Sequence, residues 1–374
     1  MRGYIFIALI IGLAGNSCIK REVLRVPTVT LKGESILKCD TTNPNYSVIN
    51  IGPVGRIQID SCGNIWISDI RNARLLKYNA KGEYLSQINF APLDSSGELP
   101  CFKYRNACDI GGLPQIWDFC IGRDGKLYAA LAIKERGYPP FFIESFDLEG
   151  KKLGEIRIEE FPQRIAVDSK GLIYITYVPI RRDIINRELV MVYDSIGQRV
   201  DSFGTTLKFY PEDSGEALLY NRVWLSIDNE DNLWMAFEVS PIVRKYNSAH
   251  QLVFERRYIT AETKRSLIKT EEYRKKFEKL KKKNPSAKPI VYGTFWDIIT
   301  PDKDSIFLIT IWNVAYRLDG NGDIKERIVL DDKIRDYTRF AISPLGEFWE
   351  CAESVEKEDS FTILHFLKKK GGEE

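Results

Sequence analysis

Arginine and tryptophan side chains recur at one position of a repeated pattern, and they are the residues of this chain best suited to hold a ligand. Each stands at the start of the first strand of a repeat. Guanidinium groups bind anions through paired hydrogen bonds, and indole rings offer a stacking surface. We predict that they line one mouth of a central channel and bind an anionic or sugar-like ligand. The residues are Arg56, Trp117, Asp118, Arg164, Trp224, Trp296 and Arg339.

The same residues also have a purely structural interpretation, which the sequence leaves open. Each arginine would then pair with a neighbouring carboxylate, and each tryptophan would fill space between repeats. A second group of candidates lies in loops that we expect to gather on one face of the fold. They are Asp69, Arg71, Arg74, Arg181, Arg182 and Trp312.

Residues that could perform catalysis or hold a metal are scarce. His250 and His365 are the two histidines of the chain, and a histidine-based zinc site would need more of them. The sequence has no Ser-His-Asp arrangement, no phosphate-binding glycine loop and no CxxC pair. Asp60, Asp168 and Asp228 recur at one turn position, so we expect them to cap turns through hydrogen bonds to the backbone. We therefore predict no catalytic residue, metal or cofactor.

The element that positions these residues is clearest between Gly55 and Ile88. Residues 56–60 alternate polar and apolar side chains, which is the period of a strand with two unlike faces. A turn follows, in which Gly63 can adopt the positive φ of a tight hairpin. Four antiparallel strands in about forty residues are typical of one propeller blade. The three remaining strands are expected at residues 65–67, 75–78 and 84–88.

Two signatures of this unit recur to the C-terminus. One is the turn after the first strand, and the other is an aromatic residue or leucine four positions before a glycine. His250 takes the place of that glycine in one copy. The recurrence predicts an all-β, six-bladed β-propeller of four-stranded antiparallel blades. The turns lie at residues 60–66, 123–128, 168–174, 228–234, 302–307 and 343–349, and the second signature starts at Tyr78, Phe146, Tyr193, Tyr246, Leu318 and Leu367.

On these residues the chain resembles the NHL-type six-bladed β-propellers, particularly the single-domain propeller lipoproteins of bacteria. The likeness covers about residues 50 to 370. It implies the fold and says little about activity, because propellers host many unrelated functions. The residues that carry it are Ile59-Asp60, Gly63-Asn64-Ile65-Trp66-Ile67-Ser68-Asp69, Arg74-Leu75, Tyr78 and Gly82.

Residues 1–17 have the composition of a secretory signal peptide. Arg2 precedes an apolar run over residues 4–13, which is short for a transmembrane helix, and small residues lead to Cys18. The segment resembles a lipoprotein signal, in which such a cysteine carries the lipid, although Gly15 stands where that signal usually has leucine. The resemblance implies a lipoprotein of the bacterial envelope, periplasmic or at the outer membrane, and the alternative is plain secretion.

The propeller is expected over residues 35–374, after a tether at residues 18–34. The last repeat has a good third strand at residues 361–366 and no fourth strand after it. A strand from residues 23–42 should supply the missing one, because closing the ring removes exposed sheet edges.

Seven cysteines are present, and an exported protein meets an oxidising compartment. Cys101 and Cys108 bracket a short loop and are the best candidates for a disulfide. Cys120 and Cys351 fall on strands of distant repeats, so we expect buried thiols. A Cys39–Cys62 pair is a weaker alternative, which requires the N-terminal strand to pass the first repeat.

One helical insertion interrupts the repeats at residues 259–289, between the fourth and fifth blades. Thr270 is the expected N-cap, and residues 281–283 are lysines that suit the C-terminal end of the helix dipole. Tyr273, Phe277 and Leu280 share one face. The helix either packs these three residues on the propeller with its lysines in water, which we favour, or touches anionic lipid or a partner.

Three functions remain open at this stage. The first, which the missing catalytic residues favour, is a non-catalytic binding or scaffold propeller at the cell envelope, with a small anionic or glycan ligand or a protein partner. The second is a protein-interaction platform that uses the basic helix. The third is a metal-dependent propeller enzyme of the lactonase or lyase kind. A net charge of +2 gives no case for nucleic acid.

Overall fold

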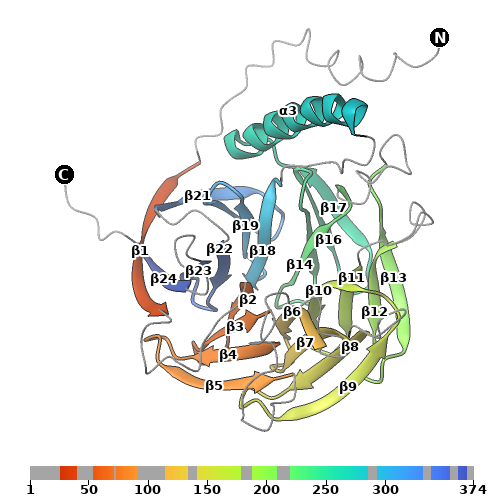
Figure 1. Cartoon of the computed structure of the whole chain (residues 1–374), viewed down its shortest axis with the longest axis vertical. Coiled ribbons are helices and arrows are strands. Elements are labelled where there is room, and N and C mark those ends of the chain that lie inside the picture. Colours follow the sequence, from red (N-terminus) through yellow and green to blue (C-terminus); the bar gives the residue numbers. More distant parts are fainter. Residues whose placement is uncertain are drawn as a thin grey trace.

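The chain folds as an all-β propeller with one helix, α3, among the residues that the structure describes (Figure 1). The structure is a computed structural model. It describes residues 26–39, 54–70, 73–90, 114–133, 141–177, 188–208, 220–284, 293–331, 338–353 and 361–368. The signal peptide, Cys18, Cys101 and Cys108 lie outside these ranges, so their predicted roles stay predictions.

Four sheets each contain four antiparallel strands in chain order, as the repeat predicts. Hairpins join successive strands, so each sheet is a simple meander. The first sheet has β2 (Val54–Ile59), β3 (Ile65–Asp69), β4 (Arg74–Tyr78) and β5 (Tyr84–Asn89), and the second has β6 (Pro114–Ile121), β7 (Leu127–Ile133), β8 (Phe141–Phe146) and β9 (Lys152–Ile158). The third has β10 (Pro162–Val167), β11 (Ile173–Tyr177), β12 (Glu188–Tyr193) and β13 (Arg199–Thr205), and the fourth has β14 (Val223–Ile227), β15 (Leu233–Phe237), β16 (Ile242–Tyr246) and β17 (Leu252–Arg257).

The remaining strands form one eight-stranded sheet where two separate blades were expected. Its order is β18-β19-β20-β21-β1-β24-β23-β22. The two halves are continuous because β1 pairs in parallel with β21 as well as antiparallel with β24. Its strands are β18 (Phe295–Asp302), β19 (Ser305–Thr310), β20 (Val314–Leu318), β21 (Ile324–Asp331), β22 (Thr338–Ile342), β23 (Phe348–Glu353), β24 (Phe361–Lys368) and β1 (Thr28–Cys39).

The N-terminal strand closes the ring, as predicted. β1 pairs with β24 from Leu31 opposite Lys368 to Cys39 opposite Phe361. It therefore supplies the strand that the last repeat lacks, and it runs across the expected boundary between residues 34 and 35. Joining the first and last parts of the chain in one sheet covers an edge that would otherwise be open to other chains.

The first strand of each meander lines the centre of the molecule. In the order β2, β6, β10, β14, β18 and β22, each of these strands contacts the next, and β22 contacts β2. Figure 1 shows them around the middle of the disc, with the later strands further out. Any residue at the same position of each first strand is therefore brought to the same level of the central channel.

The turns after the first strands have the predicted chemistry. Asp60 Oδ1 accepts hydrogen bonds from the backbone N–H groups of Cys62 at 2.9 Å and Asn64 at 2.8 Å. Asp168 and Asp228 make the same two bonds in their own turns. These aspartates cap turns, which confirms the structural interpretation. His250 has a φ of 60°, which is the conformation of the glycine it replaces.

Apolar side chains from neighbouring sheets interlock to form the core. One cluster joins Ile65 and Leu76 of the first sheet to Trp349 and Ile363 of the eight-stranded sheet. Several aromatic side chains of the strands are almost completely buried, among them Trp66, Tyr78, Tyr174 and Trp234. The apolar clusters thus join neighbouring sheets around the ring.

The helix α3 spans Ala261–Lys283, so it begins ten residues before the position that the sequence suggested. The N-cap is Thr260, which forms a capping box with Thr263, and Thr270 lies inside the helix. The sequence-based choice was wrong because contacts to the propeller, described below, stabilise the first turns. The predicted end is confirmed, with lysines in the last turn and Asn284 as C-cap.

Three cysteines of the described chain, Cys62, Cys120 and Cys351, form no disulfide. Cys120 and Cys351 are buried, as predicted. Cys62 is exposed and makes no disulfide, so the weaker Cys39–Cys62 alternative is wrong. Within the described ranges, no helix is long and apolar enough to cross a membrane.

Candidate functional site: a belt of arginines above a channel cavity

The predicted ligand residues meet around the channel. Arg339 Nε donates to the carbonyl of Gly55 at 2.9 Å, which places it beside Arg56. Arg56 Nη1 forms an ion pair of 2.8 Å with Asp118 and also lies 3.4 Å from the carbonyl oxygen of Ile165. One half of the channel wall, from β22 through β2 and β6 to β10, is thus connected by guanidinium groups.

Aromatic rings connect the other half. The guanidinium of Arg164 lies 3.7 Å from the ring centre of Trp224, and Trp224 Nε1 donates to the carbonyl of Phe295 at 3.2 Å. The next residue, Trp296, has its ring 5.1 Å from the guanidinium of Arg339. The contacts therefore return to the starting residue. We call this closed ring the arginine belt: Arg56, Asp118, Arg164, Trp224, Trp296 and Arg339.

The belt combines the two interpretations of the sequence. Its residues do converge on the channel, and several also bind one another, as the structural interpretation expected for Arg56. Trp117 does not join the belt. Its ring packs edge-on against Phe161 with the ring centres 4.2 Å apart, and its Nε1 is buried with no hydrogen-bond partner among the described residues.

Burial and charge act in opposite directions on the belt arginines. Burial disfavours the charged form of Arg56, but the carboxylates of Asp118 and Asp297 outweigh it and raise the pKa of Arg56. For Arg164, burial dominates and lowers the pKa to about 10, although the carboxylates of Asp118 and Glu238 oppose the shift. Arg164 therefore remains a cation at neutral pH, with no carboxylate ion pair in the described structure.

Asp297 belongs to this site although the sequence analysis did not select it. It is 5% exposed, and its Oδ1 accepts a hydrogen bond from its neighbour Ile298 N at 2.8 Å. Burial raises the pKa of Asp297 to about 6, although the charges of Arg56 and Arg164 oppose the shift. A signal existed in the sequence, because Trp296-Asp297 repeats the pair Trp117-Asp118.

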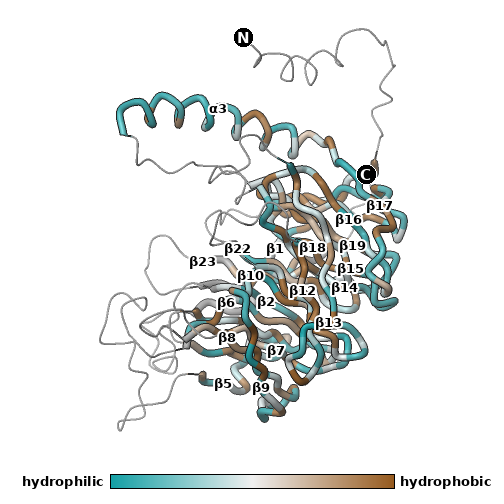
Figure 2. The backbone as a smooth tube through the Cα atoms, turned by 90° about the vertical axis from the view of Figure 1, so that its right-hand side faces the viewer, coloured by the Kyte–Doolittle hydropathy of each residue, from teal (hydrophilic) through white to brown (hydrophobic). Residues whose placement is uncertain are grey.

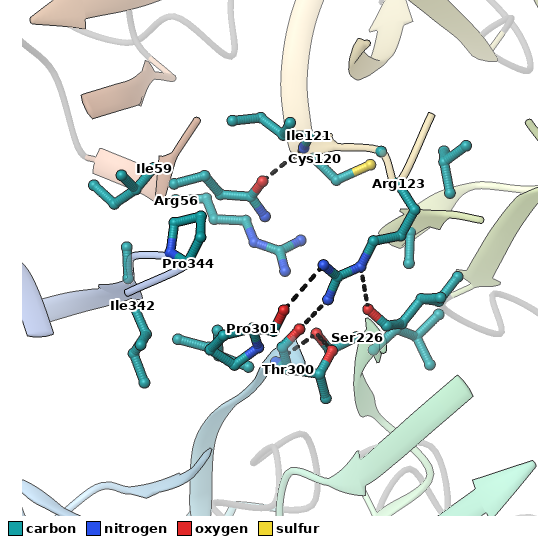
Figure 3. Close-up of a pocket in the computed structure, with 18 of the residues that line it drawn as sticks. Arg56, Ile59, Cys120, Ile121, Arg123, Ser226, Thr300, Pro301, Ile342 and Pro344 are labelled. Atoms are coloured by element: carbon teal, nitrogen blue, oxygen red, sulfur yellow. Dashed lines mark hydrogen bonds between the residues drawn. The ribbon is translucent and has the colours of Figure 1, made fainter. Parts of the chain in front are cut away.

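A cavity of about 300 Å³ occupies the channel next to the belt (Figure 3). Two charged residues line the side of the cavity that faces the belt: Arg56, which belongs to the belt, and Asp297, which lies next to it. Much of its wall is apolar and comes from the first strands of the meanders, including Ile57, Ile165 and Ile298. The predicted residues Trp117, Asp118, Arg164, Trp224, Trp296 and Arg339 do not line it.

Arg123 forms part of the opposite wall of the cavity, and sequence reasoning missed it. Its Nε donates to the carbonyl of Ile227 at 2.8 Å, Nη1 donates to Pro301 at 3.1 Å, and Nη2 donates to Thr300. Figure 3 shows this guanidinium reaching from the β6–β7 turn toward Thr300 and Pro301. Burial lowers the pKa of Arg123, and neighbouring aspartates oppose the shift.

The second group of predicted residues is engaged elsewhere. Asp69 and Arg74 form a buried ion pair of 2.9 Å. Trp312 donates to Ser266 of α3 at 2.9 Å and stacks under Arg265. Three members lie outside the described residues: Arg71, Arg181 and Arg182.

The histidines have structural partners. His250 hydrogen-bonds Asp201 and Tyr174, and it stacks on Phe203 with ring centres 4.7 Å apart. His365 stacks on Trp349. In the part of the chain that the structure describes, no three His, Cys, Asp or Glu residues are grouped so that they could hold a metal ion.

No protein-family model matches the chain. Among curated proteins, mouse transducin beta-like protein 2 is 23% identical over 112 residues, which cover 29% of this chain and 25% of that protein. The chain thus matches only about a quarter of that relative's length, and the match carries no activity over.

Similar solved structures are distant. A virginiamycin B lyase from Staphylococcus aureus is 12% identical, with 90% of this chain and 99% of that chain covered at a TM-score of 0.47. An aldose sugar dehydrogenase from Streptomyces coelicolor is 10% identical, with 91% and 100% covered at a TM-score of 0.48. At TM-scores this low, the similarities support no inference about the activity of this chain.

Proposed function

We propose that the protein is a non-catalytic binding propeller that holds a small anionic ligand in its channel. The observation that carries the proposal is the charge around one cavity. Arg56 and Arg123 line it, and Arg164 and Arg339 stand in the belt behind Arg56. Among the described residues, Arg56 is paired with Asp118, whereas Arg123 and Arg164 have no carboxylate within 4.0 Å.

An anion in the cavity would give a charged partner to Arg123, which donates to backbone carbonyls and has no carboxylate ion pair among the described residues. Asp118 is already committed to Arg56 and to the backbone N–H of Ile165 at 2.9 Å. Charge–charge interactions are stronger in a buried site than in water. Since the walls are partly polar and partly apolar, the cavity suits an anionic group attached to a compact carbon skeleton, such as a sugar acid. Its size lies at the lower end of known small-molecule sites.

The number of blades and the cellular location are also proposals. We infer that the eight-stranded sheet contains two blades joined by β1, which would make a six-bladed propeller of the NHL type. The ring of six first strands and the repeated turn aspartates support this count. We further propose a bacterial envelope location, with a lipid on Cys18, on the strength of residues 1–18.

Two alternatives remain as proposals. One is a protein-interaction platform in an envelope assembly, which would use an outer surface and leave the channel empty of ligand. The other is an enzyme of the lyase or lactonase kind. Asp297 favours this second alternative, because a buried carboxyl group with a pKa of about 6 beside guanidinium groups suits acid–base chemistry.

Thermal unfolding of the full chain with candidate ligands tests the proposal. The panel is glucuronate, inorganic phosphate, glucose and sodium chloride at matched ionic strength, each with wild type, Arg123→Gln and the surface control Arg256→Gln. A ligand at a hundred times its dissociation constant adds about 2.7 kcal/mol, or roughly 3–4 °C for a chain of this size.

We expect an anion to raise the melting temperature of wild type and of Arg256→Gln, and to raise that of Arg123→Gln much less. Equal shifts in all three proteins, or no shift beyond that of sodium chloride, would refute ligand binding in the cavity. Conversion of a bound ligand, followed by NMR and abolished in Asp297→Asn, would replace the binding proposal with the enzymatic one.

A further inference from the structure

The helix α3 is anchored to the propeller by its N-terminal turns. Glu262 forms an ion pair of 2.6 Å with Arg327 and accepts a hydrogen bond from Tyr316. Ser266 accepts the indole N–H of Trp312 at 2.9 Å. Figure 2 shows the rest of α3 continuing beyond the sheets. The second half of the helix therefore presents most of its circumference to the surroundings.

That second half carries a stripe of unneutralised lysines. Lys276, Lys279 and Lys283 are exposed and stand at positions i, i+3 and i+7, so they lie on one face. None has a carboxylate within 4.0 Å among the described residues. On the same helix, by contrast, Arg274 and Lys275 are paired with glutamates.

An apolar side chain borders the stripe. Leu280 follows Lys276 by one helical turn and is 49% exposed, although the sequence analysis expected it to pack on the propeller. Of the three residues predicted to share the packed face, Phe277 alone is buried. Lysines at a membrane surface are attracted to anionic lipid headgroups, and an exposed leucine beside them can enter the interface.

The start of the described chain lies at the anchored end of α3. The carbonyl of Pro27 accepts the backbone N–H of Arg327 at 2.9 Å, and the guanidinium of the same Arg327 binds Glu262 in the first turn of the helix. The segment before residue 26, with its apolar run at residues 4–13 and Cys18, thus joins the propeller at the edge where α3 sits.

We propose that the stripe Lys276, Lys279 and Lys283 rests on an anionic lipid bilayer, with Leu280 entering the interface. Phosphate headgroups would neutralise the lysines that no carboxylate reaches. A lipid on Cys18, in the segment that joins the propeller at the same edge, would hold that edge near a membrane and so favour this occupant over an acidic protein. The proposal concerns the outer edge of the molecule and does not depend on ligand binding in the channel.

Vesicle co-sedimentation of the full chain tests the proposal. The vesicles are phosphatidylcholine alone and phosphatidylcholine mixed with phosphatidylglycerol, because the apolar leader would bind both kinds equally. The test variant is Lys276→Gln, Lys279→Gln and Lys283→Gln together. The matched control is Lys81→Gln, Lys151→Gln and Lys170→Gln, which removes three exposed lysines from turns of other sheets.

We expect wild type and the control to prefer the anionic vesicles, and the α3 variant to lose most of that preference. Each lysine near an anionic surface adds about fivefold to the affinity, so three amount to about a hundredfold at low salt. Leu280→Gln should weaken binding while leaving its salt dependence unchanged. Circular dichroism checks that α3 persists in each variant.

Two results would overturn the proposal. One is an α3 variant with a folded helix that binds anionic vesicles as tightly as the control does. The other is a wild type that binds both kinds of vesicle equally, which would leave the stripe to an acidic protein partner. Neither result bears on the thermal-shift test of the channel.

Discussion

Removing the carboxylate of Asp118 should lower the stability of the protein far more than removing one partner of an exposed ion pair. The side chains of Arg56 and Asp118 are 9% and 2% exposed, and their atoms lie 2.8 Å apart. Asp118 also accepts the backbone N–H of Ile165 at 2.9 Å. The substitution Asp118→Asn keeps the shape of the side chain and removes its charge, which leaves the guanidinium of Arg56 buried without its partner.

The expected cost follows from burial. Breaking one side of a buried ion pair costs about 3–5 kcal/mol, because the remaining charge is no longer compensated. Unfolding entropy of about 2.1 cal/mol/K per residue amounts to roughly 0.8 kcal/mol/K for 374 residues. The melting temperature should therefore fall by about 4–6 °C.

The control is an ion pair of shorter distance and greater exposure. Lys152 and Glu155 lie 2.6 Å apart, and both side chains are 45% exposed. Exposed pairs contribute about 0–1 kcal/mol, so Glu155→Gln should lower the melting temperature by about 1 °C or less. Differential scanning calorimetry of the two variants and of wild type measures the contrast.

A double variant separates electrostatics from packing. Replacing Arg56 by Met and Asp118 by Leu removes both charges, and such replacements of buried pairs are often neutral or stabilising. It should recover most of the loss seen in Asp118→Asn. If Asp118→Asn costs no more than Glu155→Gln, or if the double variant is the least stable of all, the explanation from an uncompensated buried charge is wrong.

Three further predictions test other features of the structure. The pKa of Asp297 is raised to about 6 from 3.8, so ionisation of this carboxyl group lowers the free energy of unfolding. This loss of stability is absent below about pH 4 and grows to on the order of 3 kcal/mol by about pH 6. Urea unfolding followed against pH should show the loss in wild type and not in Asp297→Asn. Gly322 and Gly63 share a φ of 80°, but a Cβ at Gly322 would lie 2.6 Å from an aromatic carbon whereas Gly63 faces open space. Gly322→Ala should therefore cost about 1–3 kcal/mol more than Gly63→Ala in the same urea measurement, and equal costs would contradict the packing argument. Burial raises the pKa of the Cys120 thiol, while Cys62 is exposed, so iodoacetamide should label Cys62 in the native protein and Cys120 only after unfolding; early labelling of Cys120 in peptide mass spectra would argue against its burial.

The repeat made most of the fold predictable. Turn aspartates such as Asp60 act locally, through bonds to N–H groups two and four residues on, so their pattern is readable without tertiary structure. Alternation of apolar residues likewise predicted the meanders. The pairing of β1 with the last repeat was predictable because that repeat contains three strands of its own, and a closed ring of four-stranded blades needs a fourth. What the repeat did not reveal was the parallel pairing of β1 with β21, which merges two meanders into one sheet.

The helix shows where local signals fail. Both Thr260 and Thr270 have the residue type of an N-cap, and acidic residues follow each of them. The choice is made by Glu262, which binds Arg327 sixty-five residues away. No local rule contains that contact, and this is why the helix begins earlier than the sequence suggested.

Residues of the candidate site that occupy equivalent positions of the repeat were predictable, and a residue outside those positions was missed. Equivalent positions of the first strands meet at one level of the channel, so aligning the repeats was enough to assemble the belt. Arg123 has no such equivalent. At its turn, Gly122 stands where the first sheet has Asp60, and a Cβ at Gly122 would lie 2.5 Å from Asp124 Oδ1.

This exception links the turn to the chemistry of the cavity. Gly122 has no side chain to form the usual cap, and Asp124 bonds the N–H of Lys126 at 3.2 Å instead. Arg123, the next residue, extends across the channel to carbonyls of β14 and β18. Positions that follow the repeat form the arginine belt and bring Arg56 to the cavity, and a position that departs from it adds a second cation, Arg123. Departures from a repeat are therefore where function should be sought in a chain of this kind, and Arg123 is the first of them to mutate.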